Sequence, residues 1–318
     1  MSNLRTWRDL TIIVSSYNCA KYLPCTLNSI FAQTVLPKEV IVVDDAATDN
    51  SNDIIRQYQQ KHNNIQLISN DINRGVIFTV NRGFNIAQTK YVMSLAADDW
   101  ILPTFIEESM EIMTRYPQAG LCSTGSLIAI ENKNNALKLA SMPRPLKTAG
   151  YISPEEATRK LIRYDSWFMG NSVIMNLDML LQLGSYRENL TSFSDNFLYR
   201  QLSLKYGCCF IPKPLSVWRI RELGYSQSTC RSIAQLTNIM LNYSDLMEHQ
   251  FADLFPPIMV KKELKRWSFK LSKILINYQT ESHAKKIINK FMACILFAYM
   301  RPFDVGPFIA RKITPGIR

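Results

Sequence analysis

The stretch KYVMSLAADDWILPTF, residues 90–105, constrains the fold of this chain more than any other segment. Residues 91–95 have the composition of a buried β-strand, and Pro103 is typical of a helix start. Between them lie two adjacent carboxylates, Asp98 and Asp99. Acidic side chains at the carboxyl end of a strand can hold a cation, although aspartate is also common in solvated turns. The stretch alone leaves both interpretations open.

A second acidic strand end lies earlier in the chain and favours a cation site. The predicted strands are residues 10–16, 39–43, 65–69 and 91–95, and the predicted helices between them are residues 22–33, 53–61 and 76–87. Pro37 is expected to break the chain before the second strand, which ends in Asp44 and Asp45. Strands that alternate with helices pair in parallel through right-handed crossovers. Both pairs of aspartates are therefore expected along one edge of an α/β sheet.

This edge is where open α/β sheets bind their ligands. A dinucleotide-dependent oxidoreductase is excluded, because the first strand leads into SSYNCAKY, which has no glycine where G-x-G-x-x-G is required. A P-loop is absent as well. The remaining interpretation is a nucleotide whose base and ribose lie on the first two strand ends. Its diphosphate would be neutralised by a divalent cation on Asp98, and oxygen ligands suit Mg²⁺ or Mn²⁺.

Five motifs in order resemble the inverting family 2 glycosyltransferases of the GT-A fold, over roughly residues 9–228. They are TIIVSSYN (11–18), IVVDDAATDNS (41–51), NRGVIFTVNRGFNIAQTKYV (73–92), LAADDWILP (95–103) and FSDNFLYRQL (193–202). The resemblance implies a Rossmann-like, mostly parallel sheet flanked by helices. It also implies a nucleotide-sugar donor and a metal-dependent transfer of the sugar to an acceptor hydroxyl.

The resemblance also implies roles for individual residues. Asp98 matches the metal-binding position, with Asp99 beside it, and Asp195 falls on the general-base position. Apart from the resemblance, the run 167–171 could be core packing or a wall that contacts the acceptor, and Trp167 is its candidate for stacking on an acceptor sugar. The expected donor-binding residues are Ser16, Tyr17, Asn18, Asp44, Asp45, Arg74, Asp98, Arg219 and Arg221.

Asp195 also has a simpler interpretation as an acid at a helix N-terminus. Ser194 can cap a helix whose first turn contains Asp195, where the helix dipole favours the ionised carboxylate. Spacing alone favours this interpretation, and only the resemblance reverses it. If Asp195 is the base, the dipole predicts that it works at neutral pH without a raised pKa.

Several positions depart from the family pattern. Ala96 stands where an aspartate is most often found, Ser194 replaces the usual glutamate before the base, and Val80 replaces a usual arginine. The segment SVWRIR, residues 216–221, reads as a strand whose Arg219 and Arg221 project from one face. It resembles a motif in which Arg-x-His is usual, so Arg221 occupies the histidine position. These departures keep a second hypothesis open, a non-catalytic protein that binds nucleotide sugars or glycans.

The chain from residue 229 onward reads as a separate helical region. Residues 229–318 contain 14 Lys and Arg against 6 Asp and Glu, a net charge of +8 out of the total of +11. The predicted helices are residues 233–249, 261–278 and 282–300. The apolar run FMACILFAYM (291–300) is far shorter than the ~20 residues needed to span a bilayer, and its basic and aromatic flanks suit an anionic membrane surface.

The remaining features concern location and partners. No charged-then-apolar leader is visible and the 7 cysteines form no C-x-x-C pair, so we expect reduced thiols in a cytoplasm, with the basic region available to the cytoplasmic face of a membrane. A nucleic-acid partner is not expected, because no zinc-finger spacing or aromatic RNP motif is present. The acceptor is expected to be a cell-surface glycan or a lipid-linked molecule.

Overall fold

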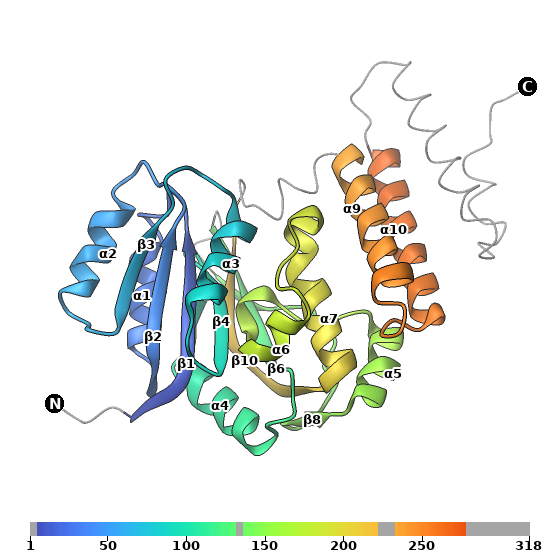
Figure 1. The fold of residues 1–318 in the computed structure, drawn as a ribbon, viewed down its shortest axis with the longest axis horizontal. Helices are drawn as coiled ribbons and strands as arrows, with labels where there is room; N and C mark the ends of the chain where they lie inside the picture. Colours follow the sequence, from blue (N-terminus) through green and yellow to red (C-terminus); the bar gives the residue numbers. More distant parts are fainter. Residues whose placement is uncertain (1–4, 132–135, 222–232, 278–318) are drawn as a thin grey trace, which may run out of the picture. The chain divides into compact units, whose positions relative to one another are not determined.

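The computed structural model describes residues 5–131, 136–221 and 233–277 (Figure 1). The chain divides into two compact units, residues 1–224 and 225–318. The first unit contains a ten-stranded sheet in the order β3-β2-β1-β4-β9-β6-β10-β5, with β7 paired to β6 and β8 paired to β10. Its strands are β1 (Arg5–Ser16), β2 (Val35–Asp44), β3 (Ile65–Ser69), β4 (Tyr91–Ala96), β5 (Trp100–Ile101), β6 (Leu121–Ile130), β7 (Leu137–Leu139), β8 (Gly150–Ile152), β9 (Val173–Asn176) and β10 (Cys208–Ile220).

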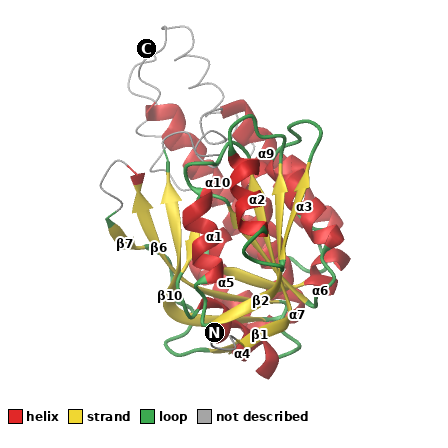
Figure 2. Cartoon of the chain, turned by 90° about the vertical axis from the view of Figure 1, so that its left-hand side faces the viewer, coloured by secondary structure: helices red, strands yellow, loops and turns green. Residues whose placement is uncertain are grey.

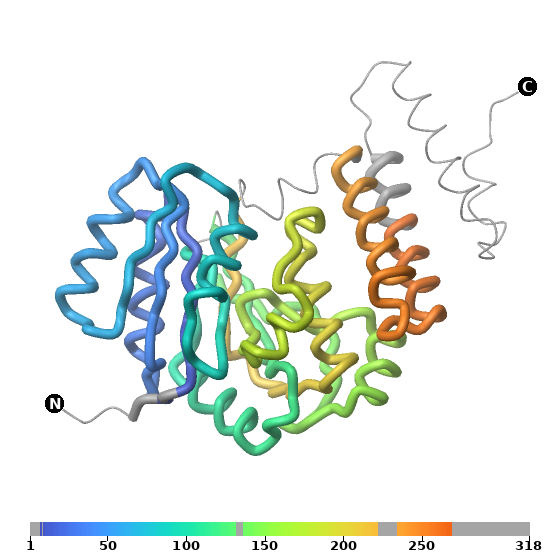
Figure 3. The backbone as a smooth tube through the Cα atoms, viewed as in Figure 1, coloured from blue at the N-terminus to red at the C-terminus, as the bar shows by residue number. Residues whose placement is uncertain are grey.

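Helices alternate with the first four strands, as the sequence predicts. The tube in Figure 3 follows this alternation through the blue to cyan part of the chain. The helices of the first unit are α1 (Leu23–Phe31), α2 (Ser51–Gln59), α3 (Val76–Ile86), α4 (Phe105–Arg115), α5 (Pro154–Tyr164), α6 (Leu177–Gln182) and α7 (Ser194–Tyr206), with 3₁₀ turns η2 (Gly170–Ser172) and η3 (Glu188–Phe193). Strands β1 to β4 are parallel to one another, so their carboxyl ends lie at one edge of the sheet.

One expectation about the sheet is wrong. Pro37 does not break the chain, because it lies inside β2 opposite Trp7, next to a register irregularity in β1. Proline has no N–H to donate, and an irregular position in a ladder tolerates it. The long ladders of the sheet are parallel, as expected, and short antiparallel pairings make it a mixed sheet. The short strand β9 runs antiparallel between β4 and β6, and β5, β7 and β8 are antiparallel additions.

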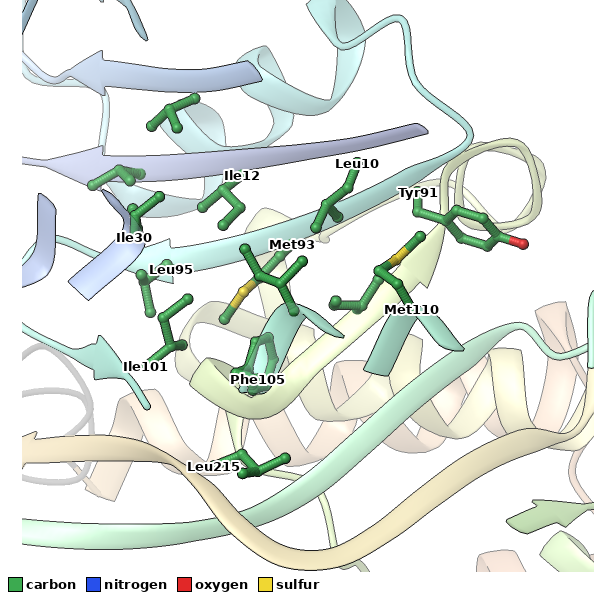
Figure 4. Packing of buried hydrophobic residues seen from close by; sticks show 14 of the residues in the cluster. Leu10, Ile12, Ile30, Tyr91, Met93, Leu95, Ile101, Phe105, Met110 and Leu215 are labelled. Carbon is green, nitrogen blue, oxygen red and sulfur yellow. The ribbon is translucent and has the colours of Figure 1, made fainter. Parts of the chain in front are cut away.

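The main core fills one face of this sheet (Figure 4). Leu10 and Ile12 alternate along β1 and pack with Ile30 of α1 and Phe105 of α4, all fully buried. Ile13 points to the opposite face, where α3 approaches so closely that a Cβ at Gly83 would lie 2.3 Å from Ile13 Cγ2. The two faces carry α1 and α3 respectively (Figure 2). This two-sided packing fixes the strand ends and the loops that follow them.

The second unit contains helix α9 (Ile233–Asp245), a π-helical turn (Leu246–Gln250) and helix α10 (Pro257–Asn277). The two helices pack on each other, with the rings of Tyr243 and Trp267 6.2 Å apart. The expected third helix, residues 282–300, and its basic and aromatic flanks lie outside the described residues. None of the helices that the structure describes has the length and apolar character needed to cross a membrane.

Candidate functional site

The carboxyl ends of β1, β2 and β4 lie side by side. Ser16 is opposite Asp44, and Ser15 is opposite Ala96. The loops begin in register as well, because the Asp45 N–H donates to the Ser16 carbonyl at 2.8 Å. The strand ends that the sequence predicted to share one edge therefore do so.

Asp44 and Ser16 present unpaired polar atoms at this edge. Asp44 is fully buried, and its Oδ2 accepts hydrogen bonds from the Ala47 N–H at 3.1 Å and the Asn52 side chain at 3.2 Å. Its Oδ1 and the Ser16 hydroxyl have no hydrogen-bond partner among the described residues. Burial raises the pKa of the Asp44 carboxyl above its usual range. Buried unpaired polar atoms are rare in folded proteins, so a ligand that pairs with them is a natural explanation.

Asp45 and Asn18 instead hold the surrounding loops. The Asp45 carboxylate accepts hydrogen bonds from the Asn70 side chain at 2.7 Å and from the N–H groups of Arg74 and Gly75, both at 2.8 Å. The Asn18 side-chain oxygen accepts the Thr48 N–H at 2.8 Å. The expected direct donor contact through the Asp45 carboxylate is therefore not supported, since the protein already occupies both of its oxygens.

The other two residues expected at the donor have accessible side chains. Tyr17 is 45% exposed at the end of β1. Arg74 is exposed, and its guanidinium lies 4.6 Å from the centre of the Phe78 ring. Both remain available to a ligand at the strand edge.

Asp99 does not fit a metal ligand. Its side chain is 5% exposed, and its Oδ1 accepts the Arg219 N–H at 2.8 Å. Burial raises the pKa of the Asp99 carboxyl well above its usual range, and the neighbouring Asp98 adds to the effect. Asp99 therefore fastens β10 to the turn after β4 rather than facing a cation.

Asp98 lies among guanidinium groups. Its Oδ2 is 2.6 Å from Arg221 Nε, and its backbone carbonyl accepts a hydrogen bond from Arg219 Nε at 2.9 Å. Both guanidinium groups also lie over the ring of Tyr22, at 5.2 Å for Arg219 and 4.9 Å for Arg221. The two arginines thus act on one face, as their alternation in the sequence predicts.

The surroundings of Asp98 and Asp99 also show how the expected divalent cation could bind. In the part of the chain that the structure describes, no cluster of three or more His, Cys, Asp or Glu residues could hold a metal ion. Mg²⁺ is often bound by one or two carboxylates together with substrate phosphates. Asp98 fits such a site as a single ligand, provided that Arg221 releases its Oδ2. Asp99 does not contribute.

Asp195 lies in the first turn of α7, but Ser194 does not cap that helix. The Ser194 hydroxyl accepts the N–H of Arg187 instead, and the helix is preceded by Phe193 at the N-cap. Asp195 Oδ1 accepts the N–H of Asn196 at 2.6 Å. Its Oδ2 lies against the backbone of Gly170, where an added Cβ would come within 2.7 Å of it. Only glycine leaves room for this carboxylate.

Two buried tyrosines, Tyr186 and Tyr199, lie near Asp195. The hydroxyls of Tyr186 and Tyr199 are 2.8 Å apart; burial raises the pKa of both, and the charge of Asp195 adds to the effect. Burial raises the pKa of Asp195 itself to about 6. The expectation that the helix dipole keeps this pKa unraised is therefore wrong, because desolvation outweighs the dipole.

Trp167 does not offer a face to a sugar. Its side chain is 1% exposed, and its ring packs 4.8 Å from that of Phe168. The interpretation as a stacking surface is corrected to core packing, which the apolar run around it could equally have indicated.

The sequence analysis missed four residues at the site, namely Tyr22, Trp100, Glu131 and Gly170. Glu131 accepts hydrogen bonds from the Tyr22 hydroxyl at 2.7 Å and from Lys21 at 2.6 Å. Trp100 lies 4.7 Å beneath the Arg219 guanidinium. Among these, only Trp100 could have been predicted from its local sequence, because it directly follows the aspartate pair. The others are brought in by contacts that are distant in sequence.

The family of this chain follows from a match to known sequences. The model of "Glycosyl transferase family 2" matches residues 11–174, about half of the chain. The chain belongs to this family. The matched residues include the strand ends that form the site.

Three curated relatives support the same conclusion. The chain is 34% identical over 137 residues to an uncharacterized glycosyltransferase of Nostoc sp. strain PCC 7120, 42% of whose length is covered. It is 32% identical over 111 residues to the putative teichuronic acid biosynthesis glycosyltransferase TuaG of Bacillus subtilis, of which 44% is covered. It is 32% identical over 194 residues to an uncharacterized glycosyltransferase of Haemophilus influenzae, of which 57% is covered. The chain thus spans about half the length of these relatives, and the shares of the chain covered are 43%, 35% and 60%.

Solved structures show the fold. The chain matches the crystal structure of S. aureus TarS 1-349 in complex with UDP-GlcNAc with a TM-score of 0.68 and 16% identity, covering 93% of this chain and 83% of TarS 1-349. It matches the mannosyltransferase PcManGT from Pyrobaculum calidifontis, in complex with GDP-Man and Mn²⁺, with a TM-score of 0.53 and 18% identity, covering 93% and 82%. The fold is the mixed α/β GT-A fold with a C-terminal helical region.

Proposed function

We propose that this glycosyltransferase inverts the anomeric centre in one displacement, moving a sugar from a nucleoside-diphosphate donor to an acceptor hydroxyl. The observation that carries this proposal is the contrast between two carboxylates near β4. Asp98 is surrounded by guanidinium groups, whereas Asp195 lies in a desolvated niche with its pKa raised to about 6. The guanidinium groups around Asp98 suit a diphosphate, and the raised pKa of Asp195 suits proton transfer.

The donor is proposed to lie along the carboxyl ends of β1, β2 and β4. Asp44 Oδ1 and the Ser16 hydroxyl are unpaired in the described structure and can pair with polar groups of the base or ribose. Arg219 and Arg221 face the diphosphate, since arginine pairs with phosphate oxygens through two parallel hydrogen bonds. The solved neighbours with UDP-GlcNAc and GDP-Man support a nucleotide-sugar donor of this kind.

Asp195 is proposed to remove the proton of the acceptor hydroxyl. A base works best when its pKa lies close to the operating pH, and a value of about 6 leaves most of the carboxylate ionised at pH 7 while keeping it a useful proton acceptor. Proton removal increases the nucleophilicity of the acceptor oxygen as it attacks the anomeric carbon. The nucleoside diphosphate departs from the opposite face, which inverts the configuration.

Asp98 is the residue that would hold Mn²⁺ or Mg²⁺ together with the donor phosphates. When bound, such a cation supplies neutralisation of the negative charge that develops on the departing diphosphate. The PcManGT complex with GDP-Man and Mn²⁺ supports a divalent cation beside a nucleotide-sugar donor in this fold.

The acceptor is proposed to be a hydroxyl of a cell-surface glycan or of a lipid-linked glycan. The similarity to a putative teichuronic acid biosynthesis glycosyltransferase supports this class. The basic region 229–318, with its net charge of +8, is proposed to lie on the anionic cytoplasmic face of a membrane. A sedimentation assay with vesicles tests this membrane binding. The chain should sediment with anionic but not with neutral vesicles, and salt should release it.

Two measurements test the function. The first is a thermal-shift screen of nucleotide sugars, because a ligand that binds the folded chain raises its apparent stability. The second is release of nucleoside diphosphate from the best donor, with the anomeric configuration of the product read by NMR. A donor that binds without any transfer or hydrolysis would favour the non-catalytic binding protein, and a product of retained configuration would overturn the single displacement.

A further inference from the structure

Two guanidinium groups lie where a divalent cation on Asp98 would have to bind. Arg221 Nε is 2.6 Å from Asp98 Oδ2, and Arg219 Nε is 2.9 Å from the Asp98 carbonyl oxygen. We infer that Arg219 and Arg221 hold the donor diphosphate themselves, so that nucleotide binding does not require a divalent cation. This inference rests on the proposed function, because it concerns the same donor site.

The charges at Asp98 oppose a second cation. Asp98 carries one negative charge, which Arg221 neutralises at contact distance. Arginine stays protonated at any physiological pH, and it has no lone pair with which to ligate a metal. A divalent ion on the same carboxylate would therefore experience repulsion from the guanidinium beside it. Cation binding at Asp98 requires Arg221 to move away first.

The two guanidinium groups are held in a fixed arrangement. Tyr22 lies against both of them, and its hydroxyl is anchored by a 2.7 Å hydrogen bond to Glu131. Trp100 supports Arg219 from another side at 4.7 Å. Cation–π contacts of this kind orient a guanidinium and reduce the entropy that it loses when a ligand binds. The pair is thus preorganised for a planar, charged ligand.

Arg221 can exchange its carboxylate for a phosphate at little cost. Its Nε is close to Asp98 Oδ2, yet the geometry does not meet the alignment of a hydrogen bond, and the side chain is 26% exposed. A misaligned ion pair gives up less free energy on release than an aligned one. A diphosphate offers Arg221 better-aligned acceptors and a greater negative charge.

The residue type at position 221 also supports nucleotide binding without a divalent cation. The motif that this segment resembles usually has a histidine at this position, and a neutral imidazole can ligate a metal. Arg221 replaces that potential ligand with a permanent positive charge. Arg221 thus places a permanent positive charge beside the carboxylate of Asp98.

The test compares nucleotide binding with and without a divalent ion. UDP and GDP are titrated by calorimetry into the full chain in EDTA and in Mn²⁺, for wild type, Arg221→Gln, Arg221→His and the control Lys213→Gln. Lys213 is a cation on β10, the strand that leads to Arg221; it is 64% exposed and paired with Glu108, away from the site. Binding of Mn²⁺ alone is followed in parallel by electron paramagnetic resonance.

For wild type, the nucleotide affinity in EDTA is expected to equal the affinity in Mn²⁺. The same is expected for Lys213→Gln. Arg221→Gln should weaken binding in EDTA by about tenfold or more, the loss expected for a charge-assisted hydrogen bond. Mn²⁺ should restore part of that affinity in both Arg221 variants, and more in Arg221→His, because Asp98 Oδ2 is then available. Both variants should also bind Mn²⁺ more tightly than wild type does.

The possible failures are distinguishable. Wild-type binding that disappears in EDTA and returns with Mn²⁺ overturns this inference and leaves the proposed function standing. An Arg221→Gln variant with wild-type affinity in EDTA also overturns the inference alone. Absence of UDP and GDP binding in both buffers overturns the inference together with the proposed donor.

Discussion

Asp98 and Asp195 are two carboxylates near β4 that the protein treats in opposite ways. Asp98 is held by an ion pair to Arg221, and a second guanidinium contacts its backbone. Asp195 lies against Gly170 and forms no ion pair within the described part of the chain. Burial raises the pKa of both carboxyls, to about 6 for Asp195, but at Asp98 the positive charges of Arg221 and Arg219 offset part of the rise.

The comparison teaches that the surroundings, not the residue type, divide the chemistry. Positive charge collects at Asp98, where negative charge develops on a departing diphosphate. Desolvation without positive charge at Asp195 leaves a carboxylate that can accept a proton near neutral pH.

The largest effect is expected for Asp195→Asn. This change keeps the shape of the side chain but removes the proton acceptor, so sugar transfer should fall by about 10²–10⁴. Donor affinity should stay near that of wild type, because the nucleotide lies on the Asp98 side. Transfer rate and donor affinity are measured on the same preparation. Wild-type transfer by this variant would mean that the base lies elsewhere.

A smaller effect is expected for Gly170→Ala. The added methyl group would lie 2.7 Å from Asp195 Oδ2, so the carboxylate must move. Misplacement of a catalytic group by about 1 Å should lower transfer by roughly 10–100-fold while donor affinity is retained. Gly150→Ala is the control, since its new methyl would meet only the flexible side chain of Leu146 at 3.4 Å. Equal activity of the two variants would remove Gly170 from the site.

The strand ends could be predicted because their signals are local. Asp98 follows its own strand, and the alternation of strands and helices is enough to bring it beside β1 and β2. The role of Asp99 could not be predicted in the same way, because its partner is a backbone N–H 120 positions later in the chain. No local pattern identifies such a contact.

The environment of Asp195 could not be predicted from a local pattern either. The first-turn position correctly indicated a helix start, but the expected Ser194 cap is replaced by a hydrogen bond from the Arg187 backbone. Its raised pKa comes from burial of the carboxylate, in a niche beside Gly170 where Tyr186 and Tyr199 are fully or nearly buried. Those residues come from other elements, so a local dipole argument gives the wrong sign for the shift.

The pH dependence of transfer tests the Asp195 side without a mutation. The base must be ionised, so the rate should rise about tenfold for each pH unit below about 6 and become constant above it. The affinity for an intact nucleotide sugar, measured over the same range, serves as the control. A rate that stays constant down to pH 4.5 would mean that the pKa of the base is not raised, as the helix dipole alone predicts.

The smallest effect concerns stability. The pKa of Asp195 is raised from its usual 3.8 to about 6, so the folded chain binds this proton more tightly than the unfolded chain does. Burying the ionised carboxylate therefore lowers the free energy of unfolding. This loss is absent below about pH 4 and reaches its full size above about pH 6. Asp195→Asn should raise the free energy of unfolding at pH 7.5 by about 1–3 kcal/mol, because the neutral amide does not carry the cost of burying a charge. The gain should disappear at pH 4.

Asp53→Asn is the matched control for this measurement. Asp53 also lies in the first turn of a helix, α2, but its side chain is 70% exposed. Here the favourable interaction with the helix dipole dominates, so its loss should leave stability unchanged or slightly lower at pH 7.5. Urea unfolding of both variants at the two pH values separates burial from the dipole. If Asp195→Asn is destabilised at pH 7.5 as Asp53→Asn is, the two first-turn aspartates share one environment, and the contrast between Asp98 and Asp195 no longer rests on desolvation.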